Sequence, residues 1–116
     1  MEDNLDYSTE EEFINKCSNK ENFLVFVSTD WCPNCKFVDA MFVTGKINTD
    51  KIIKIDPEAT GLIQKLGIDA VPSISKFING ELEEVIVGLI GIEELKETLK
   101  SLEPKKGGEA INGTNK

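Results

Sequence analysis

Residues 24–36 read LVFVSTDWCPNCK, and this stretch decides the fold. Its first four residues form a short apolar run of the kind found in strands that are buried on both faces of a sheet. A helical pattern of apolar residues begins after Cys35, so Cys32 and Cys35 lie where a strand is followed by a helix. The stretch therefore predicts a buried strand, a short loop and a helix, with two thiols at the loop.

The segment before this stretch predicts a helix from about Ser8 to Cys17. Ser8 and Glu11 have the spacing of a capping box, in which two side chains satisfy unpaired N–H groups at a helix start. Phe13, Ile14 and Cys17 share one face of that helix. Cys17 is therefore expected to be a buried, inert thiol, with a regulatory thiol as the alternative.

The helix after the cysteines is expected to end at Gly45, because glycine is a common C-terminal stop. Its expected inner face comprises Phe37, Val38, Met41 and Phe42. Residues 51–55 then predict a second strand. Asp56 and Pro57 predict a third helix, since they place a capping aspartate before a proline at the first helical position. That helix ends at Gly67, and its apolar stripe comprises Ala59, Leu62, Ile63 and Leu66.

Two further strands are expected at residues 74–78 and 82–87. They flank Asn79-Gly80, a dipeptide that tolerates positive φ at both positions and is typical of a tight hairpin turn. The apolar stripe of a last helix comprises Ile92, Leu95, Leu99 and Leu102. The resulting order is α, β, α, β, α, β, β, α, which predicts an α/β fold: a four-stranded mixed β-sheet flanked by helices on both faces.

The length of 116 residues suits one domain, expected to occupy residues 1–103. Residues 104–116 are rich in glycine, lysine and asparagine and have little to bury, so we expect a disordered tail there.

Composition excludes several classes of function. The net charge is −8, and a surface this acidic argues against binding nucleic acid or anionic membranes. Histidine is absent, which removes catalysis by Ser–His or Cys–His pairs. The N-terminus is acidic, without the apolar segment of a secretory signal, and no stretch has the apolar length of a transmembrane helix. We therefore expect a cytoplasmic protein.

The placement of Cys32 and Cys35 predicts thiol chemistry. Cys32 would lie at a helix N-terminus, where unpaired N–H groups and the helix dipole favour an anion and so lower the pKa of a thiol. Cys35 lies about one turn further on and can reach back to the first sulfur. A zinc site is the first alternative, but only Cys17 remains as a further cysteine and zinc needs about four ligands. An inert structural pair is the second alternative, disfavoured because Trp31 and Pro33 flank the pair and suggest exposure.

Four short motifs resemble those of one family. Residues 31–36 resemble the active site Trp-Cys-x-x-Cys-Lys, and residues 67–73 resemble Gly-Ile-x-x-Ile/Val-Pro-Thr. Residues 77–81 resemble a Phe-x-Asn-Gly-Glu hairpin, and Val87-Gly88 matches the small loop after the last strand. The chain thus resembles the thioredoxin family, in its small bacterial or phage form, over about residues 8–102. The resemblance implies a thioredoxin-like fold.

The resemblance also implies roles. Cys32 would attack a disulfide and form a mixed disulfide, which Cys35 would resolve. Pro72 would follow a cis peptide bond and face the cysteines, and Val71 would present its backbone to a bound peptide. The residues expected to tune the site are Trp31, Pro33, Asn34 and Lys36. Those expected to form an apolar contact patch around the sulfurs are Trp31, Pro33, Val71, Gly88 and Leu89.

The function implied is reduction of protein disulfides by dithiol–disulfide exchange, without a cofactor or a metal. Disulfide-containing proteins would be the substrates, a flavin-dependent thioredoxin reductase would recharge the chain, and it would act as a monomer. One alternative is a glutaredoxin-like enzyme, suggested by Pro33 and opposed by a missing Gly-Gly turn after Pro72. Another is a thioredoxin-fold binding module that completes a larger assembly, suggested by the apolar residues 86–92; burial of that segment is the favoured explanation.

One departure from the family concerns proton transfer. Phe26 stands where the family usually carries a buried aspartate that assists the resolving thiol, and Lys54 matches the lysine that accompanies it. Without that aspartate Cys35 lacks its customary base. We expect slower resolution, or assistance from water or from another carboxylate such as Asp30.

Overall fold

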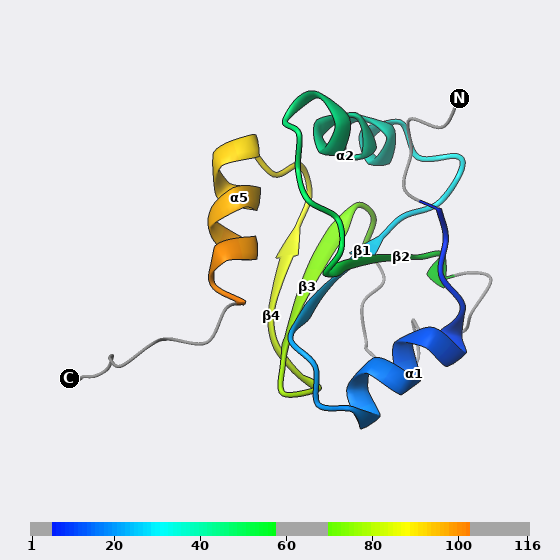
Figure 1. Ribbon diagram of the computed structural model, residues 1–116. Helices are drawn as coiled ribbons and strands as arrows, with labels where there is room; N and C mark the ends of the chain where they lie inside the picture. Colours follow the sequence, from blue (N-terminus) through cyan, green and yellow to red (C-terminus); the bar gives the residue numbers. More distant parts are fainter. Residues whose placement is uncertain (1–5, 58–69, 103–116) are drawn as a thin grey trace.

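The structure is a computed structural model, and it describes residues 6–57 and 70–102. In chain order the elements are α1 (Glu10–Ser18), β1 (Phe23–Val27), α2 (Pro33–Thr44), β2 (Ile52–Ile55), β3 (Ser73–Ile78), β4 (Glu81–Val87) and α5 (Ile92–Lys100). Figure 1 shows their arrangement around one sheet. Positions 58–67 of the predicted third helix and the predicted tail at 104–116 lie outside the described residues. Within the described part of the chain, no helix is long and apolar enough to cross a membrane.

The sheet has four strands in the order β2-β1-β3-β4. β1 and β2 are parallel, so the chain must cross over between them, and α2 makes that crossover. β3 lies antiparallel to both β1 and β4. The predicted four-stranded mixed sheet is therefore confirmed.

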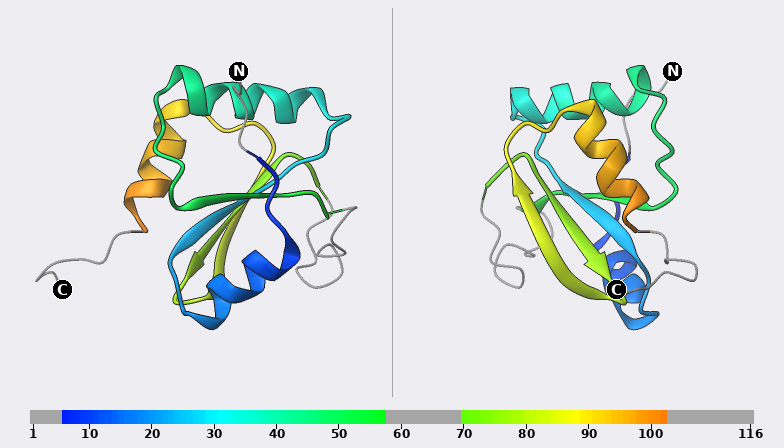
Figure 2. Two further views of the ribbon diagram at one scale, coloured as in Figure 1. Left: turned by 45° about the vertical axis from the view of Figure 1, so that its right-hand side comes forward. Right: turned by 90° about the vertical axis from the view of Figure 1, so that its left-hand side faces the viewer.

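Helices cover both faces of this sheet (Figure 2). Side chains of α2 and α5, including Val38, Phe42 and Leu95, pack with Leu24 and Ile74 in one buried cluster. On the opposite face, the only α1 residue in the buried cluster is Phe13, which packs with alternate residues of β1 and β2. Because successive side chains of a strand point to opposite faces, β1, β2 and β3 each contribute to both clusters.

The cap of α1 differs from the prediction. Thr9 is the capping residue: its hydroxyl accepts from the Glu12 N–H at 3.1 Å, and the Glu12 side chain accepts from the Thr9 N–H at 2.7 Å. The box is thus formed by Thr9 and Glu12 and not by Ser8 and Glu11. The reason is tertiary: the Ser8 N–H donates to the Lys54 carbonyl at 2.7 Å, and Tyr7 forms an isolated parallel bridge to Lys54. This pairing keeps Ser8 extended beside β2, and the helix starts one residue later.

The inner face of α2 also differs from the prediction. The buried residues are Cys35, Val38, Asp39 and Phe42, a regular i, i+3, i+4, i+7 stripe. Phe37 was predicted to face the core and is 64% exposed, whereas Met41 packs at the edge of the cluster. The prediction is confirmed at Val38 and Phe42 and wrong at Phe37, because the buried position one turn after Cys35 holds a carboxylate instead of an apolar side chain.

The predicted hairpin turn is confirmed. Asn79 and Gly80 both have positive φ, at 55° and 80°, as a two-residue hairpin of this type requires. Glycine is needed at the second position for another reason too, because an added Cβ would overlap the Cys17 carbonyl oxygen. The hairpin therefore packs directly against the end of α1.

Candidate active site

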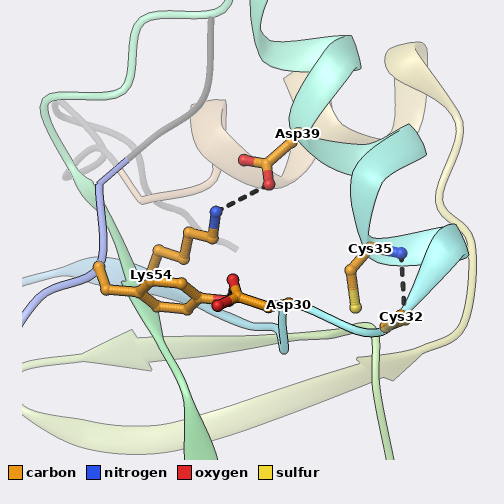
Figure 3. Close-up of polar contacts among 6 residues, drawn as sticks. Asp30, Cys32, Cys35, Asp39 and Lys54 are labelled. Carbon is orange, nitrogen blue, oxygen red and sulfur yellow. Dashed lines mark hydrogen bonds and ion pairs between the residues drawn. The ribbon is translucent and has the colours of Figure 1, made fainter. Parts of the chain in front are cut away.

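The two cysteines lie at the first turn of α2. Cys32 is the N-cap of the helix with an extended backbone, and Pro33 takes the first helical position, where a missing N–H costs nothing. The backbone N–H of Cys35 donates to the Cys32 sulfur at 3.1 Å (Figure 3). The sulfur therefore occupies the place that a capping oxygen usually fills, beside N–H groups that favour negative charge.

Both thiols are more covered than their flanking residues suggested. Cys32 is 4% exposed and Cys35 is 1% exposed, whereas Trp31 beside them is 64% exposed. The expectation of an exposed pair is corrected, because the sulfurs point into the cluster between α2 and the sheet. Of the two, Cys32 is the slightly more exposed residue. The predicted tuning residues Pro33, Asn34 and Lys36 are all exposed around it.

Burial raises the pKa of the Cys35 thiol above its usual value of 9.0. A hydrogen bond with Cys32 and the charge of that sulfur raise it further, while contacts with the Ser28 side chain and the Thr29 backbone act in the opposite direction. Cys35 therefore holds its proton at neutral pH. It becomes a nucleophile only when another group takes that proton.

The second predicted segment adjoins the cysteines. The Val71–Pro72 peptide bond is cis, as the resemblance implied. Val71 is half-buried and packs against the cluster that contains both cysteines. The Gly88 N–H donates to the Pro72 carbonyl at 2.8 Å, so the loop after β4 is fastened beside the cis bond. Gly88 has a φ of 95°, is half-buried and has open space where a Cβ would lie.

The apolar stretch at residues 86–92 is not buried throughout, which corrects the favoured prediction. Val87 is 62% exposed and Leu89 is 57% exposed, while Ile90 is buried. The side chains of Trp31, Val87 and Leu89 therefore form exposed apolar surface on segments that flank Cys32 and Gly88. Such surface suits contact with a partner protein.

Phe26 occupies the centre of β1 and is completely buried. Its ring packs edge-on against Phe42 of α2, with centroids 5.5 Å apart. No carboxylate therefore reaches the cysteines from this position of β1. Lys54, its partner in the β1–β2 register, is buried as well.

Lys54 is paired with a residue that the sequence analysis missed. Its Nζ lies 2.8 Å from Oδ2 of Asp39, and the side chains are only 6% and 5% exposed (Figure 3). The Lys54 ammonium also lies 4.4 Å from the centroid of the Tyr7 ring. The signal that could have found Asp39 is its spacing of four residues from Cys35, which places both on one face of the helix.

Asp30, the carboxylate named as a possible base, is hydrogen-bonded to a tyrosine. It is exposed, and its Oδ1 accepts a hydrogen bond from the Tyr7 hydroxyl at 3.2 Å. Partial burial, together with the charge and hydrogen bond of Asp30, raises the pKa of Tyr7 to about 12, against an opposing hydrogen bond from Ser28. Asp30 is thus tied to the chain segment before α1.

Cys17 lies at the edge of the opposite cluster and is half-buried. Burial raises the pKa of its thiol, which makes it a poor nucleophile at neutral pH. Among the residues that the structure describes, no three His, Cys, Asp or Glu side chains are placed to share a metal ion.

The chain is similar in sequence to known proteins. The family model of thioredoxin matches residues 4–101. A chloroplastic M-type thioredoxin from Brassica napus is 35% identical over 66 residues, which cover 52% of this chain and 36% of that protein. The chain thus matches about a third of the length of this curated relative.

Solved structures agree with the family model. A thioredoxin variant from Halobacterium salinarum superposes with a TM-score of 0.71 at 26% identity, covering 86% of this chain and 91% of the other. A thioredoxin from Malassezia sympodialis has the same fold, with a TM-score of 0.68 at 21% identity, covering 83% of this chain and 88% of the other. The thioredoxin-like fold expected from the sequence is confirmed.

Proposed function

The chain belongs to the thioredoxin family, and from that premise we propose that it reduces disulfide bonds in proteins through Cys32 and Cys35. The observation that carries the proposal is the hydrogen bond from the Cys35 N–H to the Cys32 sulfur at the start of α2. The Cys35 N–H is directed at the sulfur that would attack the substrate, and the thiolate is the form that attacks disulfides.

The reaction proceeds by two exchanges. The Cys32 thiolate attacks one sulfur of the substrate disulfide, forms a mixed disulfide and releases the other substrate sulfur as a thiolate, which takes up a proton. Cys35 then loses its proton and attacks the Cys32 sulfur. The Cys32–Cys35 disulfide forms, the bond to the substrate breaks, and the second substrate thiolate leaves. Two electrons pass from the cysteine pair to the substrate.

Substrate recognition is assigned to the surface next to Cys32. The exposed Trp31 offers a large apolar contact, and the backbone around Val71 and Gly88 can pair with an extended peptide. Pro33 and Asn34 lie between the thiols and would tune the reduction potential of the pair. Lys36 would add positive charge at the exposed start of α2.

Dithiothreitol-driven reduction of insulin tests the proposal. The intact protein should accelerate insulin precipitation, and Cys32→Ser should reduce the rate to that of dithiothreitol alone. Cys17→Ser is the matched control, because it removes a thiol on the other side of the sheet and should leave the rate unchanged. Equal rates for the intact protein and Cys32→Ser would refute the proposed activity.

The direction of electron flow follows from the reduction potential of the pair. A value of about −270 mV would make the chain a reductant recharged by a thioredoxin reductase, while about −120 mV would make it an oxidant. We propose the first, in a cytoplasmic setting and as a monomer. Titration against a glutathione buffer of known potential measures the value.

A binding function without redox chemistry is the second candidate, and the exposed Val87 and Leu89 favour it. A variant with both Cys32→Ser and Cys35→Ser distinguishes the two. If that variant retains the full biological effect of the protein, the apolar surface and not the thiol pair carries the function.

A further inference from the structure

β4 is the most exposed strand of the sheet. It lies at one edge, and among the described strands it pairs with β3 alone (Figure 1). Every residue of β4 except Ile86 is exposed. The strand at the other edge, β2, is buried, and the segment around Tyr7 lies beside it. An edge strand presents a row of unpaired N–H and C=O groups, so β4 is the described edge to which a further strand can be added.

One face of β4 carries an exposed apolar stripe. Leu82 is the cross-strand partner of Phe77, which belongs to the cluster on the α1 face. Val85 and Val87 pair with the residues two and four positions before Phe77, so they lie on the same face as Leu82. The register shift beside Phe77 leaves Glu83 without a partner and brings these three apolar side chains into line. All three are exposed.

The glutamates give β4 a negative charge. Glu83 is paired with Lys76 of β3 at 3.0 Å. Glu81 and Glu84 are exposed, and no lysine among the residues that the structure describes forms an ion pair with either of them. Their partners in β3 flank Phe77, so both carboxylates lie on the face opposite to the apolar stripe. The edge therefore combines an apolar face with a face that carries two uncompensated negative charges.

These charges select the segment that can occupy the edge. Like charges that lie opposite each other destabilise a pair of strands, whereas opposite charges stabilise it. A second copy of β4 would add three more carboxylates along the same edge, in a protein whose net charge is already −8. A strand with lysine or arginine on one face and apolar residues on the other would instead find a matching surface on both faces.

We propose that the free edge of β4 binds an extended protein segment in which lysine or arginine alternates with apolar residues. The segment adds a strand to the sheet, its cations lie beside Glu81 and Glu84, and its apolar side chains lie beside Leu82, Val85 and Val87. Strand addition of this kind takes its affinity from main-chain hydrogen bonds and its specificity from alternate side chains. The surface does not include the thiols, so this binding goes beyond the proposed disulfide exchange.

Titration of the reduced, ¹⁵N-labelled chain with short peptides tests the proposal. The probe is a blocked heptapeptide in which lysine alternates with valine. A glutamate–valine peptide of the same length reverses its charge. A lysine–proline peptide keeps its charge but cannot form a strand, because each proline lacks an N–H donor. None of the three contains cysteine, so binding is measured independently of thiol chemistry.

We expect the lysine–valine peptide, at about 1 mM, to shift the amide resonances of β4, and the other two peptides to leave them unchanged. Glu81→Gln with Glu84→Gln should weaken binding about fivefold through loss of two cross-strand charge pairs. Asp50→Asn with Glu97→Gln removes the same charge from exposed positions outside β4 and should weaken binding less than twofold. Glu81→Lys with Glu84→Lys should transfer the preference to the glutamate–valine peptide.

Three results would overturn the proposal. Equal binding of the lysine–proline and lysine–valine peptides would show that charge alone attracts them. Equal weakening by the two double variants would show that net charge, and not the edge, is recognised. A dimer in sedimentation, with concentration-dependent shifts of the β4 resonances in the absence of peptide, would assign the edge to a second copy. Insulin reduction by Glu81→Gln with Glu84→Gln should match that of the parent, so failure of the proposed disulfide reduction is distinguishable from failure of this inference.

Discussion

The two faces of the sheet have different contents, although the same strands build both. On the face covered by α1, the rings of Phe13, Phe23 and Phe77 form a contiguous group, with Phe23 and Phe77 stacked 4.9 Å apart. On the face covered by α2 and α5, the apolar cluster includes Cys32 and Cys35, and α2 also buries the Asp39 carboxylate. The core on the α1 face consists largely of packed aromatic rings, whereas the core on the α2 face also contains two thiols and a charged side chain.

The α1 face should therefore contribute mainly to folding stability, whereas the α2 face carries the thiol chemistry. Removing a ring from the α1 face should cost folding free energy and leave the thiols unaffected, because the described residues of the cluster that holds these rings include none from α2. Changing polar groups on the α2 face should alter thiol kinetics more than stability, provided that no charge is left without a partner. Four measurements test this division, in decreasing order of expected effect.

Phe77→Ala should have the largest effect. The side chain is buried and packs against two other rings, so its loss should lower the free energy of unfolding by about 4 kcal/mol. Urea denaturation followed by Trp31 fluorescence measures the loss. The rate of insulin reduction should stay within twofold at low temperature, where the variant is folded. A changed rate would show that the two faces are coupled.

Lys54→Met should cost about 3 kcal/mol, because it leaves Asp39 as an uncompensated buried charge. Adding Asp39→Leu should restore most of that loss, to within about 1 kcal/mol of the parent, since an apolar pair can replace a buried ion pair. Urea denaturation of the two variants decides the point. If the double variant is as unstable as the single one, the pair is retained for stability and the division between the faces fails.

Thr9→Ala should lower the free energy of unfolding by about 1 kcal/mol through loss of the helix cap on the α1 face. Ser8→Ala is the control and should have almost no effect, because Ser8 uses its backbone N–H and not its hydroxyl to pair with Lys54. Comparison of the two midpoints in urea separates the observed cap from the predicted one. A larger loss in Ser8→Ala would restore the prediction made from sequence.

The smallest effect concerns Tyr7, which is partly exposed. Its pKa is raised to about 12, so the folded state keeps a proton that the unfolded state loses near pH 10. The stabilising contribution is therefore complete below pH 10 and is lost as the pH rises through 12. Absorbance at 295 nm follows this residue directly, because the chain has one tyrosine. A midpoint near 10 in the folded protein would contradict the partial burial of Tyr7 and its contact with Asp30.

Much of the fold and of the site was predictable, because the signals lie within a few residues of one another. The apolar run at β1, the Asn79-Gly80 turn and the glycine after α2 each specify a local conformation, and each prediction is confirmed. The placement of Cys32 and Cys35 at a helix start is likewise confirmed. The conformation of a strand, a turn or a helix cap depends mainly on residues close by in the chain, so the sequence alone can predict it.

Tertiary structure decided the parts that depend on distant contacts. Pairing with β2 moved the cap of α1 from Ser8 to Thr9. Packing of α2 against the sheet turned Phe37 outward and Asp39 inward, where it meets a lysine 15 residues away in the chain. The sequence by itself determined which of the described elements form and where the thiols lie. Which side chains face the thiols depends on how helix and strand are brought together, because a charged residue is buried only where the fold supplies its partner.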